Sequence, residues 1–298
     1  MGYINIFINS QAKININNNQ LTLVAADKSI DYPLEDVNSV MIDNPKTTIS
    51  FVTLSKLAEY GILTYVCDDK HLPNGVLLPF YNHYQTLTIY HYQIDIPKPL
   101  QKNLWQTVVK NKIANQNEVL NLIGCKDKLK PLSATVLSGD SANNEAKASA
   151  IYFKSLFGKD FARKNELLST NAMLNYGYAV VRGSVARSVV AHGLLPFLGI
   201  FHHNQFNQFN LADDLMEIFR PLVDLFVKCE LKDKSELTPA VKFSLCDLIN
   251  YDLIINGQKQ TLNNAIDMFV ESFAKSIMSK TNCLKTVSVF GLNRHKYE

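Results

Sequence analysis

The spacing of apolar residues changes one third of the way along the chain, and this change constrains the fold more than any other feature. Before it, short segments rich in Ile, Val and Tyr alternate with Asn-rich or Asp-containing turns, a pattern typical of β-strands. After it, apolar residues recur about every 3.6 positions, as at Leu100, Leu104 and Val108, which predicts helices. Pro97 and Pro99 stand at the change. Because proline stiffens the backbone and removes a hydrogen-bond donor, we place a domain boundary there.

The expected fold class is α+β. A small N-terminal β-rich domain, residues 1–96, is joined to a larger all-α C-terminal domain, residues 97–298. With 298 residues, 47% of them apolar, the chain is long enough to bury a sizeable core. Four short segments of the first domain are predicted to be antiparallel strands: 3–9, 12–16, 20–25 and 29–32.

Cysteine usage and hydropathy indicate where the protein is expected to work. The five cysteines are scattered and show no CxxC pair, which argues for reduced thiols rather than a disulfide framework or a zinc ribbon. The N-terminus lacks a basic segment followed by an apolar one. The most apolar stretch, residues 176–201, is interrupted by Arg182, Arg187 and Pro196, each costly in a bilayer. We therefore expect a cytoplasmic protein with no membrane segment.

Charge is shared unevenly between the two parts. Residues 1–96 hold 5 Lys and no Arg against 9 Asp and Glu, whereas the remainder holds 25 basic and 18 acidic residues. The second part therefore carries +7 and is the candidate for an anionic partner such as nucleic acid. Ordinary domains also reach this charge.

Residues 196–221 contain the strongest candidate for a functional site. Two adjacent histidines, His202 and His203, lead through an Asn-rich loop into a helix that carries Asp213 and Glu217. Several carboxylates and an imidazole suit a hard or borderline divalent cation. A short acidic run that opens a helix is also a common solvated face that complements the helix dipole. From the residues alone, both interpretations stay open.

Three charged residues elsewhere have two interpretations each. Glu145 lies on a predicted helix whose residues one turn away are small, so a bulky group could approach it; an exposed glutamate on an ordinary helix has the same pattern. Arg182 and Arg187 lie in an otherwise apolar helix predicted over residues 169–195. Burying arginine is costly unless it is paired, so each arginine is either the partner of a buried carboxylate or a phosphate contact.

Together, the motifs resemble a known family. They are NEAKASAIYFKSLFG, NYGYAVVRGSVARSVVAHGL and PFLGIFHHNQFNQFNLADDLMEIFRPLVD in the second part, and YPLEDV, IDNP and CDDKHLPNG in the first. The chain resembles the CRISPR-associated endonuclease that serves as the integrase of the spacer-adaptation module, in the branch found in type II systems. This likeness runs from INIFINSQ to at least Asp224.

The resemblance implies a metal site and DNA contacts. A glutamate, a histidine and an acidic residue of the helical domain bind Mn²⁺ or Mg²⁺ in the family, and these positions fall on Glu145, His202 and Glu217. The LG-x-x-H spacing selects His202, with His203 as the fallback. The basic helix of the family falls on Arg182 and Arg187, which the resemblance implies as DNA contacts. Asp213 and Asp214 then take an outer or dipole-complementing role.

The resemblance also implies an assembly. The β-rich domain is expected to mediate a homodimer. Two such dimers are expected to flank a dimer of the small ferredoxin-like companion protein of the same module, which gives a heterohexamer.

The expected function is metal-dependent phosphoryl transfer on DNA. The chain is expected to insert new spacers into a CRISPR array by attack of a DNA 3′-OH on a phosphodiester, and to cut DNA when water attacks instead. The first alternative is a non-catalytic basic scaffold that binds DNA. The second is an oxygenase or zinc hydrolase that uses both His202 and His203, although adjacent side chains are hard to aim at one ion.

Overall fold

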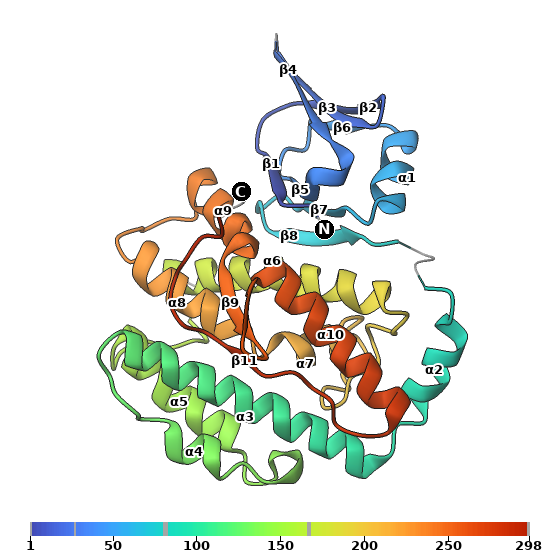
Figure 1. Cartoon of the computed structure of the whole chain (residues 1–298). Helices are drawn as coiled ribbons and strands as arrows, with labels where there is room; N and C mark the ends of the chain where they lie inside the picture. Colours follow the sequence, from blue (N-terminus) through green and yellow to red (C-terminus); the bar gives the residue numbers. More distant parts are fainter. Residues whose placement is uncertain (1, 27, 80–82, 166–167, 297–298) are drawn as a thin grey trace.

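A β-rich N-terminal part is stacked on a larger, mostly helical part, as Figure 1 shows. The structure is a computed structural model that describes residues 2–26, 28–79, 83–165 and 168–296. The arrangement confirms the predicted fold class. Helix α2 (Thr86–Ile94) precedes the proline pair and packs on the helical part, because the Gln93 amide donates hydrogen bonds to the backbone oxygens of Leu195 (2.9 Å) and Leu198 (3.1 Å). The described helices include none with the length and apolar character needed to cross a lipid bilayer.

Two four-stranded sheets make up the β-rich part. Their strands, in chain order, are β1 (Ile4–Ile8), β2 (Lys13–Asn17), β3 (Gln20–Ala25), β4 (Lys28–Pro33), β5 (Val37–Ile42), β6 (Thr48–Ile49), β7 (Leu63–Cys67) and β8 (Pro73–Leu77). The first sheet has the order β1-β5-β7-β8, in which only β8 is antiparallel to its neighbour. The second has the order β4-β3-β2-β6. A 3₁₀ turn (Leu34–Asp36) leads into β5, and helix α1 (Phe51–Glu59) leads toward β7.

The antiparallel pairing predicted for the first four segments holds for β2, β3 and β4 but is wrong for β1. Strand β1 pairs in parallel with β5, where Ile6 lies opposite Val40. Parallel neighbours need a crossover connection between them, and the β2–β4 meander provides it. Turn residues next to β1 carry no information about a partner that lies beyond that crossover.

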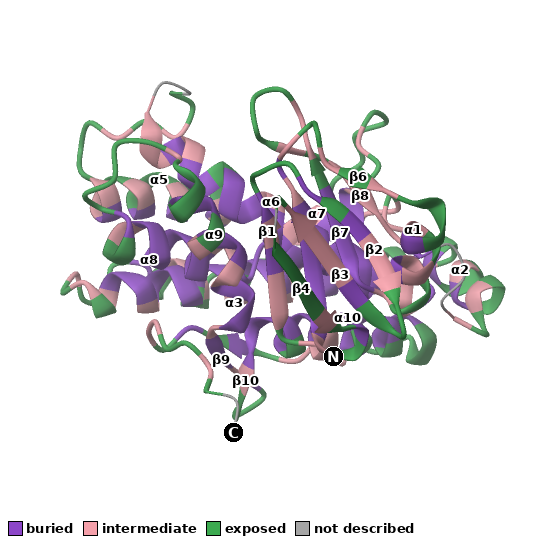
Figure 2. Cartoon of the chain, turned by 90° about the horizontal axis from the view of Figure 1, so that it is seen from above, coloured by how far each residue is buried: buried purple, intermediate pink, exposed green. Residues whose placement is uncertain are grey.

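The helical part is built around one buried helix, α6. Its helices are α3 (Lys98–Leu122), α4 (Lys130–Ala134), α5 (Asn144–Phe157), α6 (Ser169–Ala191), α7 (Asn210–Met216), α8 (Arg220–Glu230), α9 (Pro239–Asp247) and α10 (Leu262–Ser279), with 3₁₀ turns at Ser138–Asp140 and Leu248–Asn250. Helix α6 packs against α7, α8, α9 and α10. Figure 2 shows it largely buried, whereas edge strand β4 is exposed.

A small sheet inside the helical part was not predicted. It has the order β10-β9-β11, with β9 at Asp252–Ile255, β10 at Gln258–Thr261 and β11 at Val287–Ser288. Asn256 and Gly257 form its hairpin turn, both with positive φ (49° and 80°). An Asn-Gly pair is the strongest short-range hairpin signal, so the sequence did contain this information.

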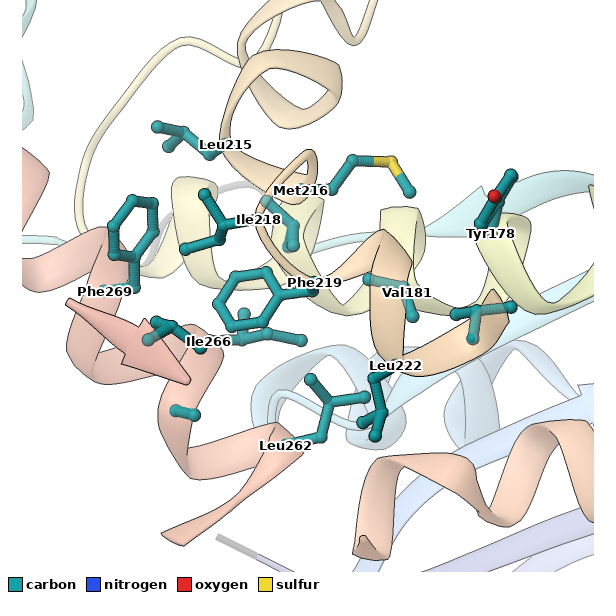
Figure 3. Packing of buried hydrophobic residues seen from close by; sticks show 14 of the residues in the cluster. Tyr178, Val181, Leu215, Met216, Ile218, Phe219, Leu222, Leu262, Ile266 and Phe269 are labelled. Atoms are coloured by element: carbon teal, nitrogen blue, oxygen red, sulfur yellow. The ribbon is translucent and has the colours of Figure 1, made fainter. Parts of the chain in front are cut away.

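The acidic helix α7 and the start of α8 are anchored by apolar packing, shown in Figure 3. Phe219 is fully buried and contacts Phe269 of α10 edge to face, with ring centroids 5.8 Å apart. Leu215, Ile218 and Leu222 are also fully buried. The polar side chains between these residues are therefore held in place by a close-packed core.

Candidate functional site

Glu145 lies in the first turn of α5, at the edge of the helical part. Asp140 caps this helix, because its carboxylate accepts hydrogen bonds from the backbone N–H groups of Asn144 (2.8 Å) and Glu145 (3.0 Å). The Glu145 side chain is about one quarter exposed, and its Oε1 lies 2.6 Å from Nζ of Lys112. The helix N-terminus also favours a negative charge at this position.

Glu217 lies between α7 and α8, where the chain changes direction just before Pro221. Its side chain is buried, and its carboxylate contacts Lys112 Nζ (2.5 Å) and an Arg220 guanidinium nitrogen (3.0 Å). Burial raises the pKa of Glu217, but the charges of Arg220 and Lys112 outweigh burial and hold the pKa below its ordinary value. The group is therefore an ionised carboxylate at neutral pH.

Lys112 of α3 joins these two carboxylates and was not identified from the sequence. Its side chain is buried. Burial lowers the pKa of Lys112, and the charges of Glu217 and Glu145 more than offset this effect, so the pKa is raised. A sequence signal was present: Lys112 follows Val108 by four residues and Val109 by three, which puts it on the apolar face of its helix. A lysine on a buried face needs an anionic partner.

His202 is oriented by a fully buried carboxylate, that of Asp214. Nδ1 of His202 lies 2.6 Å from Asp214 Oδ1, and Asp214 also accepts hydrogen bonds from the backbone N–H groups of Ile200 (2.7 Å), Phe201 (2.9 Å) and His202 (3.2 Å). Gly199 makes room for this loop, since a Cβ there would lie 2.3 Å from the His202 carbonyl oxygen. With a proton on Nδ1, the lone pair of Nε2 is left for a cation.

Aromatic rings hold the other sides of His202. Trp105 stacks on Phe201 with centroids 4.3 Å apart, and both rings meet the His202 ring edge to face, at 6.0 and 5.2 Å. The hydrogen bond to Asp214 raises the pKa of His202, and partial burial acts in the opposite direction. His203 is exposed, and no described residue hydrogen-bonds to its side chain. The geometry thus favours His202, although its role as a ligand stays a prediction.

The two arginines predicted to contact DNA lie in different environments. Arg182 is about one third exposed and pairs with Asp213 (2.7 Å). It also donates a hydrogen bond to Asn207 Oδ1 (2.7 Å) and stacks over Phe209. Together with Phe209 it lines a cavity of about 320 Å³ between α6 and the β7–β8 hairpin.

Arg187, by contrast, is buried where the two parts of the molecule meet. Its guanidinium donates hydrogen bonds to the backbone and side-chain oxygens of Asn38 in β5 (both 2.9 Å) and to Asn263 of α10 (2.5 Å). These neutral oxygens satisfy it without the buried carboxylate that we considered from the sequence. The environment gives no support to a DNA contact at Arg187, and we do not carry that assignment further.

The donor set can be tested for its fit to a divalent cation. Among the described residues, no group of three or more His, Cys, Asp and Glu is arranged to hold a metal ion as it stands. The Lys112 ammonium contacts both Glu145 and Glu217. The chemistry nevertheless fits Mn²⁺ or Mg²⁺, with two carboxylates and one imidazole close enough that His202 and Glu217 shift each other's pKa. Glu217 Oε2 is buried and makes no well-directed hydrogen bond, despite its contact with Lys112. A cation would have to take this oxygen from the Lys112 ammonium, whose Nζ lies 2.5 Å away.

Comparisons with known proteins identify the family of this chain. The family model described as CRISPR associated protein Cas1 matches residues 6–240. The CRISPR-associated endonuclease Cas1 of Neisseria meningitidis serogroup C (strain 8013) is 39% identical over 305 residues, and the match covers 100% of each chain.

Two solved structures share the fold. A casposase bound to its integration product has a TM-score of 0.78 at 15% identity, over 95% of this chain and 92% of that chain. A Cas6-RT-Cas1--Cas2 complex has a TM-score of 0.71 at 16% identity, over 99% of this chain and 36% of that chain. These two structures show the fold, and the family model and the Neisseria relative show the family. The chain belongs to the Cas1 family of CRISPR-associated proteins.

Proposed function

We propose that this chain is a divalent-metal-dependent DNA endonuclease and integrase that inserts new spacers into a CRISPR array. The proposal rests on one observation. Glu145 and Glu217 both contact the ammonium of Lys112, and the imidazole that Asp214 orients belongs to the same site. The Neisseria relative is named an endonuclease. The casposase of similar fold is bound to an integration product, and this supports strand transfer as the reaction.

The residues divide the work as follows. Glu145, His202 and Glu217 would hold Mn²⁺ or Mg²⁺, which when bound polarises a phosphodiester and stabilises the leaving oxygen. In the transfer, a DNA 3′-OH attacks phosphorus and loses its proton to solvent; the new P–O bond forms as the bond to the leaving 3′-oxygen breaks, and that oxygen takes up a proton. Asp214 fixes the tautomer of His202, and Arg220 keeps Glu217 ionised.

Binding of DNA is proposed to use the basic helical part. Its charge of +7 attracts a polyanion. Arg182 is the residue best placed for a phosphate contact, since its side chain is partly exposed and lines an open cavity. In that contact, a phosphate would compete with Asp213 for the guanidinium.

The assembly is also a proposal. Exposed apolar side chains on the β-rich part, Phe51 and Val52 of α1 and Ile30 of β4, support a homodimer through this part. The Cas1–Cas2 complex of similar fold supports a small ferredoxin-like companion protein, arranged with two Cas1 dimers as a heterohexamer. All five cysteines are free thiols, which supports a cytoplasmic location.

An integration assay tests the proposal. The protein, its companion and a prespacer DNA are incubated with a plasmid that carries a repeat, with Mn²⁺ or with EDTA. We expect joined product only with Mn²⁺, and at least a hundredfold loss for Glu217→Ala with DNA binding retained. Glu271→Ala is the matched control, because Glu271 is an exposed glutamate of α10 paired with Lys285. Strand transfer by Glu217→Ala at the wild-type rate would sink the assignment.

The scaffold alternative has one observation in its favour, because Lys112 and Arg220 together already balance the charges of the two carboxylates without a metal ion. A scaffold would bind DNA equally well in Mn²⁺ and EDTA and would release no product in either. The same assay therefore separates the two functions.

A further inference from the structure

We propose that Lys112 is the internal counter-ion of this site, and that a divalent cation and the Lys112 ammonium compete for Glu145 and Glu217. The inference rests on the proposed function, because it takes these two carboxylates as metal ligands. It adds a property of the chain itself: the affinity for metal is set partly by a lysine that the metal must displace.

The position of Lys112 carries the first step. Its Nζ lies 2.6 Å from Glu145 Oε1 and 2.5 Å from Glu217 Oε2. In the described part of the chain, Nζ has no other hydrogen-bond or ion-pair partner. The ammonium therefore occupies the space between the two carboxylates, where a bridging cation would also have to lie.

Helix α3 holds the backbone of Lys112 firmly. One residue before it, Asn111 exchanges hydrogen bonds with the backbone of Val287 in β11, at 2.5 and 2.8 Å. Three residues after it, the Asn115 amide donates to the backbone oxygen of Ile218 (2.9 Å), next to Glu217. The ammonium is thus brought to the site by the fold, and only the four-carbon side chain is free to withdraw it.

The charges around the site show that a metal ion would repel the Lys112 ammonium. Glu145, Glu217, Lys112 and Arg220 together are neutral, and Arg182 matches Asp213. Asp214, whose partner His202 is neutral when its Nε2 lone pair is left for a cation, adds one negative charge. Two additional positive charges among these groups repel the ammonium at short range, where a low effective dielectric strengthens the repulsion. Binding of the metal is therefore opposed by the Lys112 ammonium. Without either cation, two facing carboxylates would be left, one of them buried, which is strongly destabilising.

This arrangement predicts opposite effects of one substitution. In Lys112→Met the metal-free protein should lose stability, since the carboxylates lose their partner, and the affinity for Mn²⁺ should rise, since no ammonium has to move. If Lys112 instead supported metal binding by orienting the carboxylates, its removal would weaken Mn²⁺ binding.

The experiment is a titration of the DNA-free protein with Mn²⁺. Trp105 is the only tryptophan of the chain, and its ring lies 6.0 Å from that of His202, so quenching of its fluorescence by the paramagnetic ion reports binding directly. Isothermal calorimetry checks the constant. We expect a Kd for Mn²⁺ at least tenfold lower in Lys112→Met than in the wild type, a lower Tm without metal, and recovery of most of that Tm on saturation with Mn²⁺.

Lys242 provides the matched control. It is equally buried and pairs with a buried acid, Asp43, at 2.9 Å, away from the site. Lys242→Met should lose Tm as well, but Mn²⁺ should not restore it, and the Kd for Mn²⁺ should equal that of the wild type.

Equal or weaker Mn²⁺ binding by folded Lys112→Met would overturn the inference. If that variant does not fold without metal, Lys112→Gln carries the same test with an amide that can still donate to both carboxylates. If neither folds, both are refolded with Mn²⁺: recovery supports the competition, and failure to recover overturns it.

Two further variants separate this inference from the proposed function. If Glu145→Gln and Glu217→Gln bind Mn²⁺ as the wild type does, the metal site itself is wrong, and the inference falls with it. If both lose Mn²⁺ binding but Lys112→Met gains none, the metal site stands and only the role of Lys112 is refuted.

Discussion

The substitution Asp214→Asn should weaken the contribution of His202 to the metal site without leaving a cavity in the core. Each oxygen of Asp214 accepts two hydrogen bonds: Oδ1 from His202 Nδ1 and N, and Oδ2 from the backbone of Ile200 and Phe201. An asparagine side chain can accept the pair of hydrogen bonds at only one of these two positions, because its NH₂ group faces donors at the other. Hydrogen bonds to a charged group contribute about 1.5–3 kcal/mol each, so the loss of two costs about 3–6 kcal/mol of folding free energy.

The effect on metal binding depends on which side is lost. If the amide NH₂ turns toward His202, it donates to Nδ1 and drives the imidazole proton onto Nε2, the nitrogen left for the cation. Loss of such an outer partner costs about 10–100-fold in metal affinity. Trp105 quenching by Mn²⁺ at pH 8 measures this loss, and NMR of the His202 ring reports the tautomer. Asp213→Asn, whose carboxylate pairs with Arg182 instead, is the control.

The pH dependence of stability has a definite sign. The hydrogen bond to Asp214 raises the pKa of His202 above its ordinary value. A raised pKa in the folded state contributes stability that is fully present below the unfolded pKa, ordinarily about 6.5, and lost as the pH rises through the folded value. Asp214→Asn should therefore cost more stability at pH 6 than at pH 9. Unchanged Mn²⁺ affinity, together with an unchanged tautomer, would refute the reasoning.

Three further variants concern groups outside the metal ligands. Burial raises the pKa of Asp224 from 3.8 to about 6. The fold therefore loses stability as the pH rises from about 3.8, where the unfolded carboxyl ionises, to about 6, and the loss is complete above that value. Asp224→Asn should gain stability relative to the wild type by on the order of 2 kcal/mol between pH 4 and pH 8. Urea unfolding at both pH values measures this gain, and a difference that does not vary with pH would contradict it. Arg182→Ala should reduce the slope of log K against log salt for DNA binding by about 1. Arg187→Ala should leave that slope unchanged but lower the free energy of unfolding by about 3 kcal/mol, since it removes the buried hydrogen bonds that the guanidinium donates to Asn38 and Asn263; equal slopes for both variants would refute the distinction.

The general layout was predictable because it depends on local patterns. The change of apolar period at Pro97 predicted a β-rich part before it and a helical part after it, as the structure has them, although α1 and α2 precede it and β9, β10 and β11 follow it. The partner of β1 was not predictable in the same way, since β5 lies beyond a three-strand meander. The hairpin of β9 and β10 had a local signal in Asn256 and Gly257, which was overlooked in a region that otherwise has helical spacing.

The candidate site was harder to predict because it is assembled from four separate segments. Residue types alone left Glu145 and Glu217 open, and only the family resemblance selected them as a pair with His202. Lys112 and the ring of Trp105 come from α3, whose apolar spacing had indicated a core helix. Their contacts depend on how α3 packs against α5 and α7, and one sequence without its fold does not contain that information.

The hydrogen bonds of Asp214 have a mechanical consequence. They attach the loop of His202 to α7, and Glu217 follows α7 directly, so these two side chains belong to one rigid body. Glu145 is held by different contacts, because α5 is capped by Asp140 and packs on α3. The site thus has two separately supported halves, one with His202 and Glu217 and the other with Glu145. A shift of α5 relative to α7 would change the gap between the carboxylates while the spacing of His202 and Glu217 stays constant.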